Sequence, residues 1–212
     1  MNLTNLENKN IEKKHMIIAA GIEEFSRKSY YDASTDAIVQ GCKISKGLLF
    51  HYFGSKKEFY LYCLSISLER LMEPTAVPEG KFYDILFGIM NQKLQVCAKY
   101  PRETKFVNMA SRETSSDVAK GKEDIFAKYA SQTHAASSVI MKQALATLSL
   151  KEEQLKKAKE GLLLYTNAVM GKYLGAYQNN PADFFNNVEY IQLEIKEYID
   201  LMLCGIVKED NV

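Results

Sequence analysis

Closely spaced signals for helix starts limit what residues 34–58 can fold into. Ser34 or Thr35, then Ser45, then Ser55 each stand just before a short segment with apolar residues. A hydroxyl oxygen in that place accepts one of the backbone N–H groups that the first helical turn leaves unbonded. Glu58 follows Ser55 by three residues and completes a capping-box pattern. The pattern predicts three short helices in succession.

The residues between the first two of these helices indicate a turn. Gly41, Cys42 and Lys43 interrupt the helical pattern, so the first helix is expected to run through Ile38 and Val39 and the second over residues 46–52. In a helix-turn-helix of this kind, the second helix presents its N-terminal residues to base edges of DNA. Capping patterns also occur in ordinary helical bundles, so they leave a bundle and a DNA-binding unit both open.

The same window is basic. Between Asp36 and Glu58 no acidic residue occurs, while the formal net charge of the whole chain is only +1. The basic residues of the window are Lys43, Lys46, His51, Lys56 and Lys57. Such side chains, with small, hydroxyl and aromatic neighbours, suit a major groove and its phosphates. The sequence therefore predicts a DNA-binding regulator.

Short motifs extend this pattern on both sides. They are an apolar face of Ile18, Ala19, Ile22 and Phe25, then Ser29-Tyr30, Ala33-Ser34, Ile38, Ile44-Ser45-Lys46-Gly47, His51-Tyr52-Phe53 and Ser55-Lys56-Lys57-Glu58. Together they resemble the N-terminal domain of TetR-family transcriptional regulators over roughly residues 11 to 62. The resemblance implies three helices packed under a fourth, and a homodimer that binds a palindromic operator.

The chain departs from the family pattern in the turn and the recognition helix. The turn usually contains a glycine in the family, and this chain has Lys43 at that position. A lysine at positive φ would cost about 1 kcal/mol, which favours a turn of a different type. In the second helix of the motif, the recognition helix, the family commonly has a small hydroxyl residue and a tyrosine. This chain has Leu48 and Phe50 at those two positions. Both replacements favour contact with thymine methyl groups, or simple burial, over hydrogen bonding.

Roles at the DNA follow from the resemblance and the side-chain chemistry. Lys46 can reach guanine acceptors or phosphate, Gly47 lets the backbone approach the duplex, and Tyr52 can donate to a phosphate. The DNA-binding residues we expect are Ser34, Thr35, Ser45, Lys46, Gly47, Leu48, Phe50, His51, Tyr52 and Lys56. Leu49 and Phe53 are assigned to the domain core.

Two prolines and a glycine in residues 74–80 predict a break after the DNA-binding part. We therefore expect residues 1–72 to form an N-terminal arm and helix-turn-helix domain, and residues 73–212 a helical regulatory and dimerisation domain. The polar residues 1–15 suggest a short flexible arm. The absence of a long apolar run, of a secretion signal and of paired cysteine spacing favours a cytoplasmic protein without a membrane span.

The second domain is also expected to be helical, so the predicted fold class is all-α. Apolar residues recur at helical spacing over residues 81–100, around 106–110, over about 117–148, from a cap at Ser149 to about 178, and over 184–202. Breaks at Pro101 and at Asn179-Asn180-Pro181 separate some of these helices. No alternating strand pattern occurs.

The last two predicted helices carry features of a dimer interface. A seam of apolar residues at alternating spacings of four and three consists of Phe184, Val188, Ile191, Ile195, Tyr198 and Met202. Gly171 and Gly175 offer a groove for a close helix. The resemblance implies a four-helix bundle between two copies, with recognition helices roughly 34–36 Å apart. Packing inside one chain is the alternative for both features.

Between these regions the chain is rich in aromatic and methionine side chains suited to a large apolar ligand. The pocket residues we expect are Tyr83, Phe87, Met90, Phe106, Met109, Phe126, Tyr129, His134, Met141, Tyr165 and Tyr173, with His134 as polar anchor. Each of them singly also fits an ordinary core. The implied partners are double-stranded DNA, a small-molecule effector and a second copy of the chain.

No pattern for catalysis occurs. The chain has three histidines and neither a Gly-rich phosphate loop nor a metalloprotease or nucleophile-elbow motif. Carboxylate pairs such as Glu23-Glu24 and Glu152-Glu153 are expected on solvated helix faces. We therefore expect no enzyme, cofactor or metal site. Two alternatives to a regulator stay open: an architectural chromosome-binding protein of the same fold, and a helical ligand- or partner-binding module with degenerate DNA binding.

Overall fold

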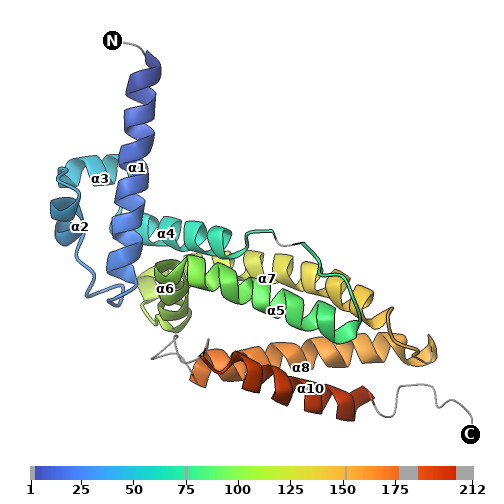
Figure 1. The fold of residues 1–212 in the computed structure, drawn as a ribbon. Helices are drawn as coiled ribbons and strands as arrows, with labels where there is room; N and C mark the ends of the chain where they lie inside the picture. Colours follow the sequence, from blue (N-terminus) through green and yellow to red (C-terminus); the bar gives the residue numbers. More distant parts are fainter. Residues whose placement is uncertain (1–2, 75, 151, 177–185, 204–212) are drawn as a thin grey trace, which may run out of the picture. The chain divides into compact units, whose positions relative to one another are not determined.

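The structure, a computed structural model, describes residues 3–74, 76–150, 152–176 and 186–203 (Figure 1). Its elements are α1 (Leu3–Phe25), α2 (Thr35–Gly41), α3 (Lys46–Phe53), α4 (Lys56–Leu71), α5 (Phe82–Lys99), α6 (Pro101–Arg112), α7 (Ser116–Leu145), the 3-10 helix η1 (Glu152–Gln154), α8 (Leu155–Ala176) and α10 (Val188–Leu203). No strand occurs in the described ranges, and the all-α prediction is confirmed. None of the helices described is long and apolar enough to cross a membrane.

The chain divides into two compact units. Unit 1 combines residues 1–73 with 96–130, and unit 2 combines 74–95 with 131–212. The expected domain boundary between residues 72 and 73 stays a prediction. The core of unit 1, however, takes Phe106, Val118 and Tyr129 from beyond that boundary. Residues 1–72 therefore do not supply the whole core around the helix-turn-helix.

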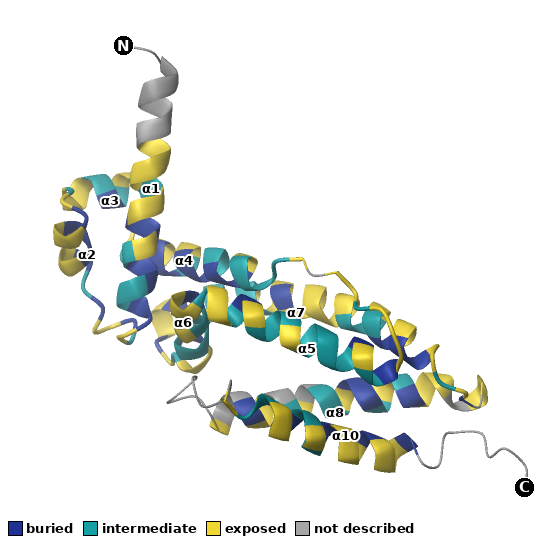
Figure 2. Ribbon diagram, viewed as in Figure 1, coloured by how far each residue is buried: buried dark blue, intermediate teal, exposed yellow. Residues whose placement is uncertain are grey.

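An aromatic cluster holds unit 1 together. In this unit α1 packs against α2, α4 and α6, and α4 also packs against α3 and α6. The Phe25 ring stacks on Phe106 at a centroid distance of 5.6 Å, and Tyr60 meets the two rings edge-on at 4.9 and 5.1 Å. Leu49 and Phe53 of α3 are buried, as expected. Figure 2 shows that buried and half-buried residues make up most of α4, while α1 is exposed over part of its length.

The N-terminal segment differs from the flexible arm expected from sequence, because α1 already begins at Leu3. Residues 2–20 contain neither glycine nor proline, so nothing in this segment interrupts a helix. Side chains further along α1 contact the helix-turn-helix. The Tyr52 hydroxyl donates to Asn10 Oδ1 at 3.5 Å, and Lys14 Nζ lies 5.8 Å from the centre of the Phe53 ring.

In unit 2, α8 packs along α10. The core residues are Phe82 and Ile85 of α5, Met141, Ala144 and Leu145 of α7, Leu150, Ala158, Leu162, Leu163 and Tyr173 of α8 and its approach, and Ile191, Ile195, Ile199 and Leu203 of α10. Polar contacts join α10 to α5, since the Tyr83 hydroxyl donates to Asp200 and Gln192 Nε2 donates to Asn91 Oδ1 at 2.8 Å. The helices expected after residue 80 are present, although α8 begins after η1 rather than at Ser149.

Among the described cysteines, Cys42 and Cys63 are free thiols. Cys42 and Cys63 are buried, and Cys97 is half-buried. Burial raises the pKa of the Cys42 and Cys63 thiols, which disfavours the thiolate needed for oxidation or metal binding. Cys204 lies outside the described residues.

Candidate nucleic-acid interface

Serine hydroxyls cap the N-termini of α2, α3 and α4, as the sequence predicts. Ser34 Oγ accepts from the backbone N–H of Ala37, Ser45 Oγ from that of Leu48, and Ser55 Oγ from that of Glu58, each at 3.2 Å. Ser34 rather than Thr35 caps α2, because Thr35 is the first helical residue and its side chain is buried. These caps fix where α2, α3 and α4 begin.

The turn between α2 and α3 has the positive-φ geometry that a lysine disfavours. Lys43 has a φ of 53°, in the left-handed region. The backbone N–H of Ile44 donates to Val39 O at 3.0 Å, and that of Lys43 donates to Gln40 O at 3.1 Å. This pair of bonds is a Schellman motif, and buried Val39 with half-buried Ile44 provides the apolar pair that accompanies it. The expectation of a different turn type was wrong, because these contacts outweigh the strain at Lys43.

Replacing Lys43 by glycine is expected to raise the free energy of unfolding by about 1 kcal/mol, because glycine adopts positive φ without a Cβ clash. Lys57, in the first turn of α4, is the matched control. Lys57→Gly should lower the free energy of unfolding by up to about 1 kcal/mol. Urea unfolding of both variants measures the two changes, and a loss of stability in Lys43→Gly would contradict the strain at this turn.

One face of α3 is anchored in the core and the other is open. Leu49 and Phe53 are buried, while Leu48, Phe50 and Tyr52 are half-buried. The exposed residues are Ser45, Lys46, Gly47 and His51. A Cβ built on Gly47 would meet only Ser45 Oγ, at 3.9 Å, so the backbone is open to an approaching surface there. A short helix with a free N-terminal face is the geometry that reads a major groove.

Two lysines expected to contact DNA have partners inside the chain. Lys46 Nζ lies 2.9 Å from Asp36 Oδ1, which joins α3 to α2. Lys56 Nζ donates to the backbone carbonyl of Tyr31 at 3.1 Å and lies 5.0 Å from the centre of the Tyr30 ring. Burial lowers the pKa of the Lys56 ammonium despite the nearby carboxylates. Asp36 entered the sequence argument only as the edge of the basic window, and no spacing rule identifies its pairing with Lys46.

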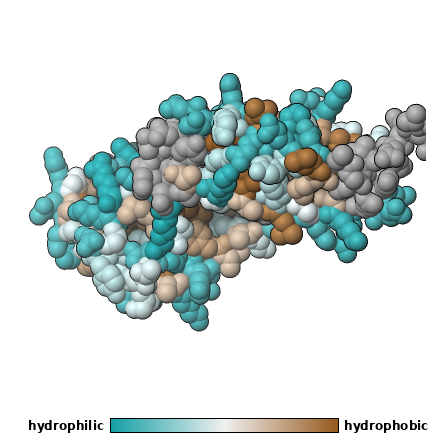
Figure 3. Space-filling view, turned by 90° about the horizontal axis from the view of Figure 1, so that it is seen from below, coloured by the Kyte–Doolittle hydropathy of each residue, from teal (hydrophilic) through white to brown (hydrophobic). Residues whose placement is uncertain are grey.

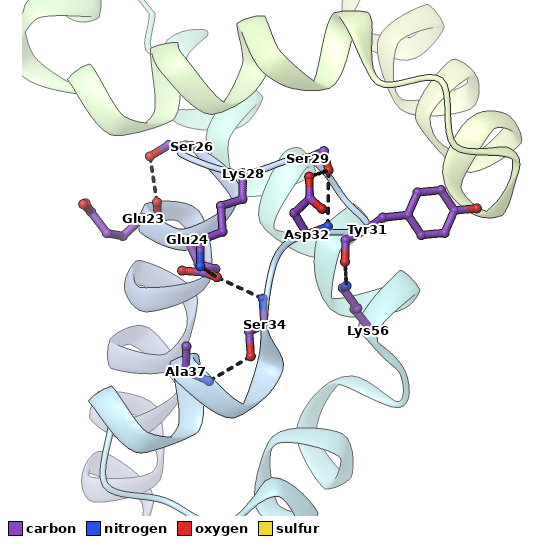
Figure 4. A network of polar contacts seen from close by, with 10 residues as sticks. All are labelled: Glu23, Glu24, Ser26, Lys28, Ser29, Tyr31, Asp32, Ser34, Ala37 and Lys56. Carbon is purple, nitrogen blue, oxygen red and sulfur yellow. Dashed lines mark hydrogen bonds and ion pairs between the residues drawn. The ribbon is translucent and has the colours of Figure 1, made fainter.

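Glu24 positions the start of α2 (Figure 4). Its Oε1 accepts from the backbone N–H of Ser34 at 2.9 Å and from Lys28 Nζ at 2.9 Å. Glu23 pairs with Arg27 and with Arg102, 2.6 Å away. The expectation that Glu23 and Glu24 occupy a merely solvated face was therefore wrong. The partners Ser34 and Arg102 are distant in sequence, so helical periodicity could not identify them.

Burial raises the pKa of the Glu24 carboxyl, but the hydrogen bonds from Lys28 and from the backbone of Ser34 lower it by more, so its pKa lies below the ordinary value of a glutamate. A lowered pKa in the folded state stabilises the fold above the unfolded value and loses that effect as pH falls through the folded value. Glu24→Gln should therefore lower the free energy of unfolding by about 1 kcal/mol at neutral pH. Denaturant unfolding across pH measures this difference, which should shrink in acid; a constant difference would contradict it.

The residues expected to line an effector pocket fall in two cores. Phe106, Phe126 and Tyr129 belong to the core of unit 1. Tyr83, Phe87, Met90, Met141, Tyr165 and Tyr173 belong to that of unit 2. Met109 is half-buried on α6, and His134 is exposed on α7, so the structure does not place this histidine among the apolar clusters. Within the described ranges no group of three or more His, Cys, Asp or Glu side chains is arranged to hold a metal ion.

The predicted dimer seam on α10 is divided. Ile191 and Ile195 are buried inside unit 2, while Tyr198 and Met202 are exposed and Val188 is half-buried. Phe184 and the surroundings of Gly175 lie outside the described residues, and Gly171 is exposed with open space around it. The exposed apolar side chains of α10 also include Tyr190, Leu193 and Leu201, which the seam omitted. Buried isoleucines and exposed residues share one apolar pattern, so spacing alone could not separate core from surface.

Comparisons with known proteins agree with this geometry. Residues 17–63 match the family model described as bacterial regulatory proteins, tetR family. The chain is 34% identical over 58 residues to the HTH-type transcriptional regulator HbdR of Aromatoleum sp. (strain CIB), and 39% identical over 54 residues to the uncharacterized HTH-type transcriptional regulator YuxN of Bacillus subtilis (strain 168). These matches cover 27% and 26% of this chain and only 25% and 19% of those relatives.

A comparison of structures extends the likeness in fold beyond this domain. The crystal structure of a TetR family transcriptional regulator from Chloroflexus aurantiacus J-10-FL aligns with a TM-score of 0.57 and 20% identity, covering 93% of this chain and 94% of that one. At this identity the likeness concerns the fold. The capped helices, the Schellman turn and the open face of α3 lie in residues 17–63, the part of the chain that is similar to the tetR family of bacterial regulatory proteins.

Proposed function

We propose that this protein is a DNA-binding transcriptional regulator, a repressor that binds a palindromic operator as a homodimer and is released by a small apolar or aromatic effector. The observation that carries the proposal is the exposed N-terminal face of α3, with Ser45, Lys46 and Gly47 presented beside the capped start of α2. The tetR-family match over the same residues supports it. The expected DNA contacts are otherwise those predicted from the sequence.

The homodimer is proposed to form through α10. Three exposed apolar side chains on this helix, Tyr190, Leu193 and Leu201, have 65%, 55% and 72% of their surface accessible. Hydrophobic patches are visible on the surface in Figure 3. Large exposed apolar side chains gathered on one helix favour an interface with another chain. Gly171 on α8, with open space around it, allows a second helix to approach.

Leu201→Glu is expected to shift the protein from dimer to monomer, because the new charge would be buried at the interface without a partner. Since Leu201 is exposed in the single chain, the variant should stay folded as a monomer. Val139→Glu on α7 is the matched control, since Val139 is also exposed. Analytical ultracentrifugation measures the association. A dimer unaffected by Leu201→Glu, or equally weakened by Val139→Glu, would contradict the α10 interface.

The effector is proposed to bind among the aromatic and methionine side chains of unit 2. In the described part of this unit, Tyr165 Oη and Gln92 Oε1 are buried and find no hydrogen-bond partner. Unsatisfied buried polar groups cost free energy, so a ligand that bonds them gains specificity. These atoms replace exposed His134 as the polar anchors of the proposal. Release from DNA requires that the effector bind the DNA-incompetent state more tightly.

Selection of bound fragments from a genomic DNA library, sequenced at two salt concentrations, tests the function. A few near-palindromic sites with half-sites about one helical turn apart would support a dimeric operator-binding regulator. Many unrelated sites that persist in the presence of candidate effectors would support an architectural protein instead. If no fragment is enriched even at low salt, the helical binding module with degenerate DNA binding replaces the proposal.

A further inference from the structure

The ion pair between Asp36 and Lys46 lies within the proposed DNA-binding face. The Lys46 ammonium is 2.9 Å from Asp36 Oδ1 and 3.0 Å from Oδ2, so both carboxylate oxygens are engaged. Asp36 is in the first turn of α2, and Lys46 is the first residue of α3. The pair thus joins the starts of the two helices that would meet the duplex.

This ion pair contributes little to the stability of the fold. Its side chains are 64% and 49% exposed, and ion pairs that exposed contribute at most about 1 kcal/mol. Asp36 is nevertheless the only carboxylate, in the part of the chain that the structure describes, that pairs with Lys46 at the start of the recognition helix. An acidic side chain close to DNA repels phosphates, and it also neutralises a lysine that would otherwise attract them.

We propose that Asp36 is a specificity-determining residue of the DNA interface, which holds Lys46 and so suppresses binding to DNA of unrelated sequence. This inference rests on the proposed function. Non-specific affinity comes from lysine and arginine charges that displace counterions from phosphates. A lysine already paired with a carboxylate displaces fewer counterions. At the operator, guanine O6 and N7 can replace Asp36 as acceptors for Lys46. Pairing with Asp36 therefore lowers the affinity for the operator less than the affinity for unrelated DNA.

The test is Asp36→Asn in the full-length protein, with binding to a duplex of random sequence and to the selected operator measured by fluorescence anisotropy over a salt series. Non-specific binding should tighten about three- to eight-fold at 0.1 M salt, and its salt slope should steepen by up to about 0.9, the value of one additional phosphate contact. Affinity for the operator should increase less, so the ratio of operator affinity to random-sequence affinity should fall.

Two further variants separate this role from a general change in charge. Asp124→Asn removes the same charge from an exposed residue of α7, and it should leave both affinities nearly unchanged. In a Lys46→Met background, Asp36→Asn should lose most of its effect, because the lysine it frees is gone. Loss of the favourable interaction of Asp36 with the start of α2 would weaken the fold slightly. Tighter binding therefore cannot come from damage to the helix.

The inference is overturned if Asp36→Asn tightens non-specific binding no more than Asp124→Asn does, or if its full effect persists without Lys46. Either result leaves the proposed function standing, provided that the unmodified protein binds the operator. Absence of any salt-dependent DNA binding by the unmodified protein would overturn the proposed function, and this inference with it.

Discussion

Gly47→Ala is expected to weaken operator binding about ten-fold, equivalent to about 1.4 kcal/mol, while stabilising the fold. In the free protein a Cβ at this position has only Ser45 Oγ near it, so alanine fits. Alanine should also raise the free energy of unfolding by up to about 1 kcal/mol, because it favours a helix more than glycine does. At the DNA, however, the new methyl group would occupy the space into which the duplex approaches.

Opposite signs in stability and binding make this prediction specific. Electrophoretic mobility shifts or anisotropy with the selected operator measure the affinity, and thermal unfolding measures the stability. Gly41→Ala is the matched control, because Gly41 is also exposed with nothing within 4 Å and has no proposed DNA contact. If Gly47→Ala binds the operator as tightly as Gly41→Ala does, the backbone of α3 does not approach DNA closely at Gly47.

Phe106→Ala is expected to lower the free energy of unfolding by about 3–5 kcal/mol. Phe106 has no exposed surface, and its ring packs on Phe25 of α1 and Tyr60 of α4. Alanine would remove the aromatic contacts and leave a cavity between α1, α4 and α6. Because α6 belongs to unit 1, the loss should also destabilise α1 and α4 and reduce DNA binding as the temperature rises.

Urea unfolding measures this change, and Met109→Ala is the matched control. Met109 lies on the same helix but is only half-buried, so its truncation should cost clearly less. A fragment ending at residue 72 offers a second test, since it lacks Phe106, Val118 and Tyr129. The fragment should unfold at lower temperature than the whole chain. A fragment as stable as the whole chain would show that α6 and α7 are dispensable for this core.

The local features of the DNA-binding part follow from the sequence. The hydroxyls of Ser34, Ser45 and Ser55 fix three helix starts, because a cap acts between residues three apart. The burial of Leu49 and Phe53, with Lys46 and Gly47 exposed, also follows from the helical period of α3. These features depend on interactions within one or two turns, which sequence spacing records directly.

Contacts between distant residues had to come from the tertiary structure. Sequence spacing gives no sign of three such contacts: the hydrogen bond from the Ser34 backbone N–H to Glu24, the ion pair of Asp36 with Lys46, and the packing of Phe106 against Phe25 of α1. The turn at Lys43 was misjudged because the strain of one residue was known, whereas the two backbone bonds that compensate for it were not.

On α10, the sequence by itself determined a continuous apolar pattern and hence a helix. Only packing against α8 and α5 decided which side of that helix is core, burying Ile191 and Ile195 and leaving Leu193 and Leu201 exposed. The physical reason is that helical periodicity depends on the chain's own geometry. Burial depends on which other helices pack against this one, and those helices are formed by residues far away in the sequence.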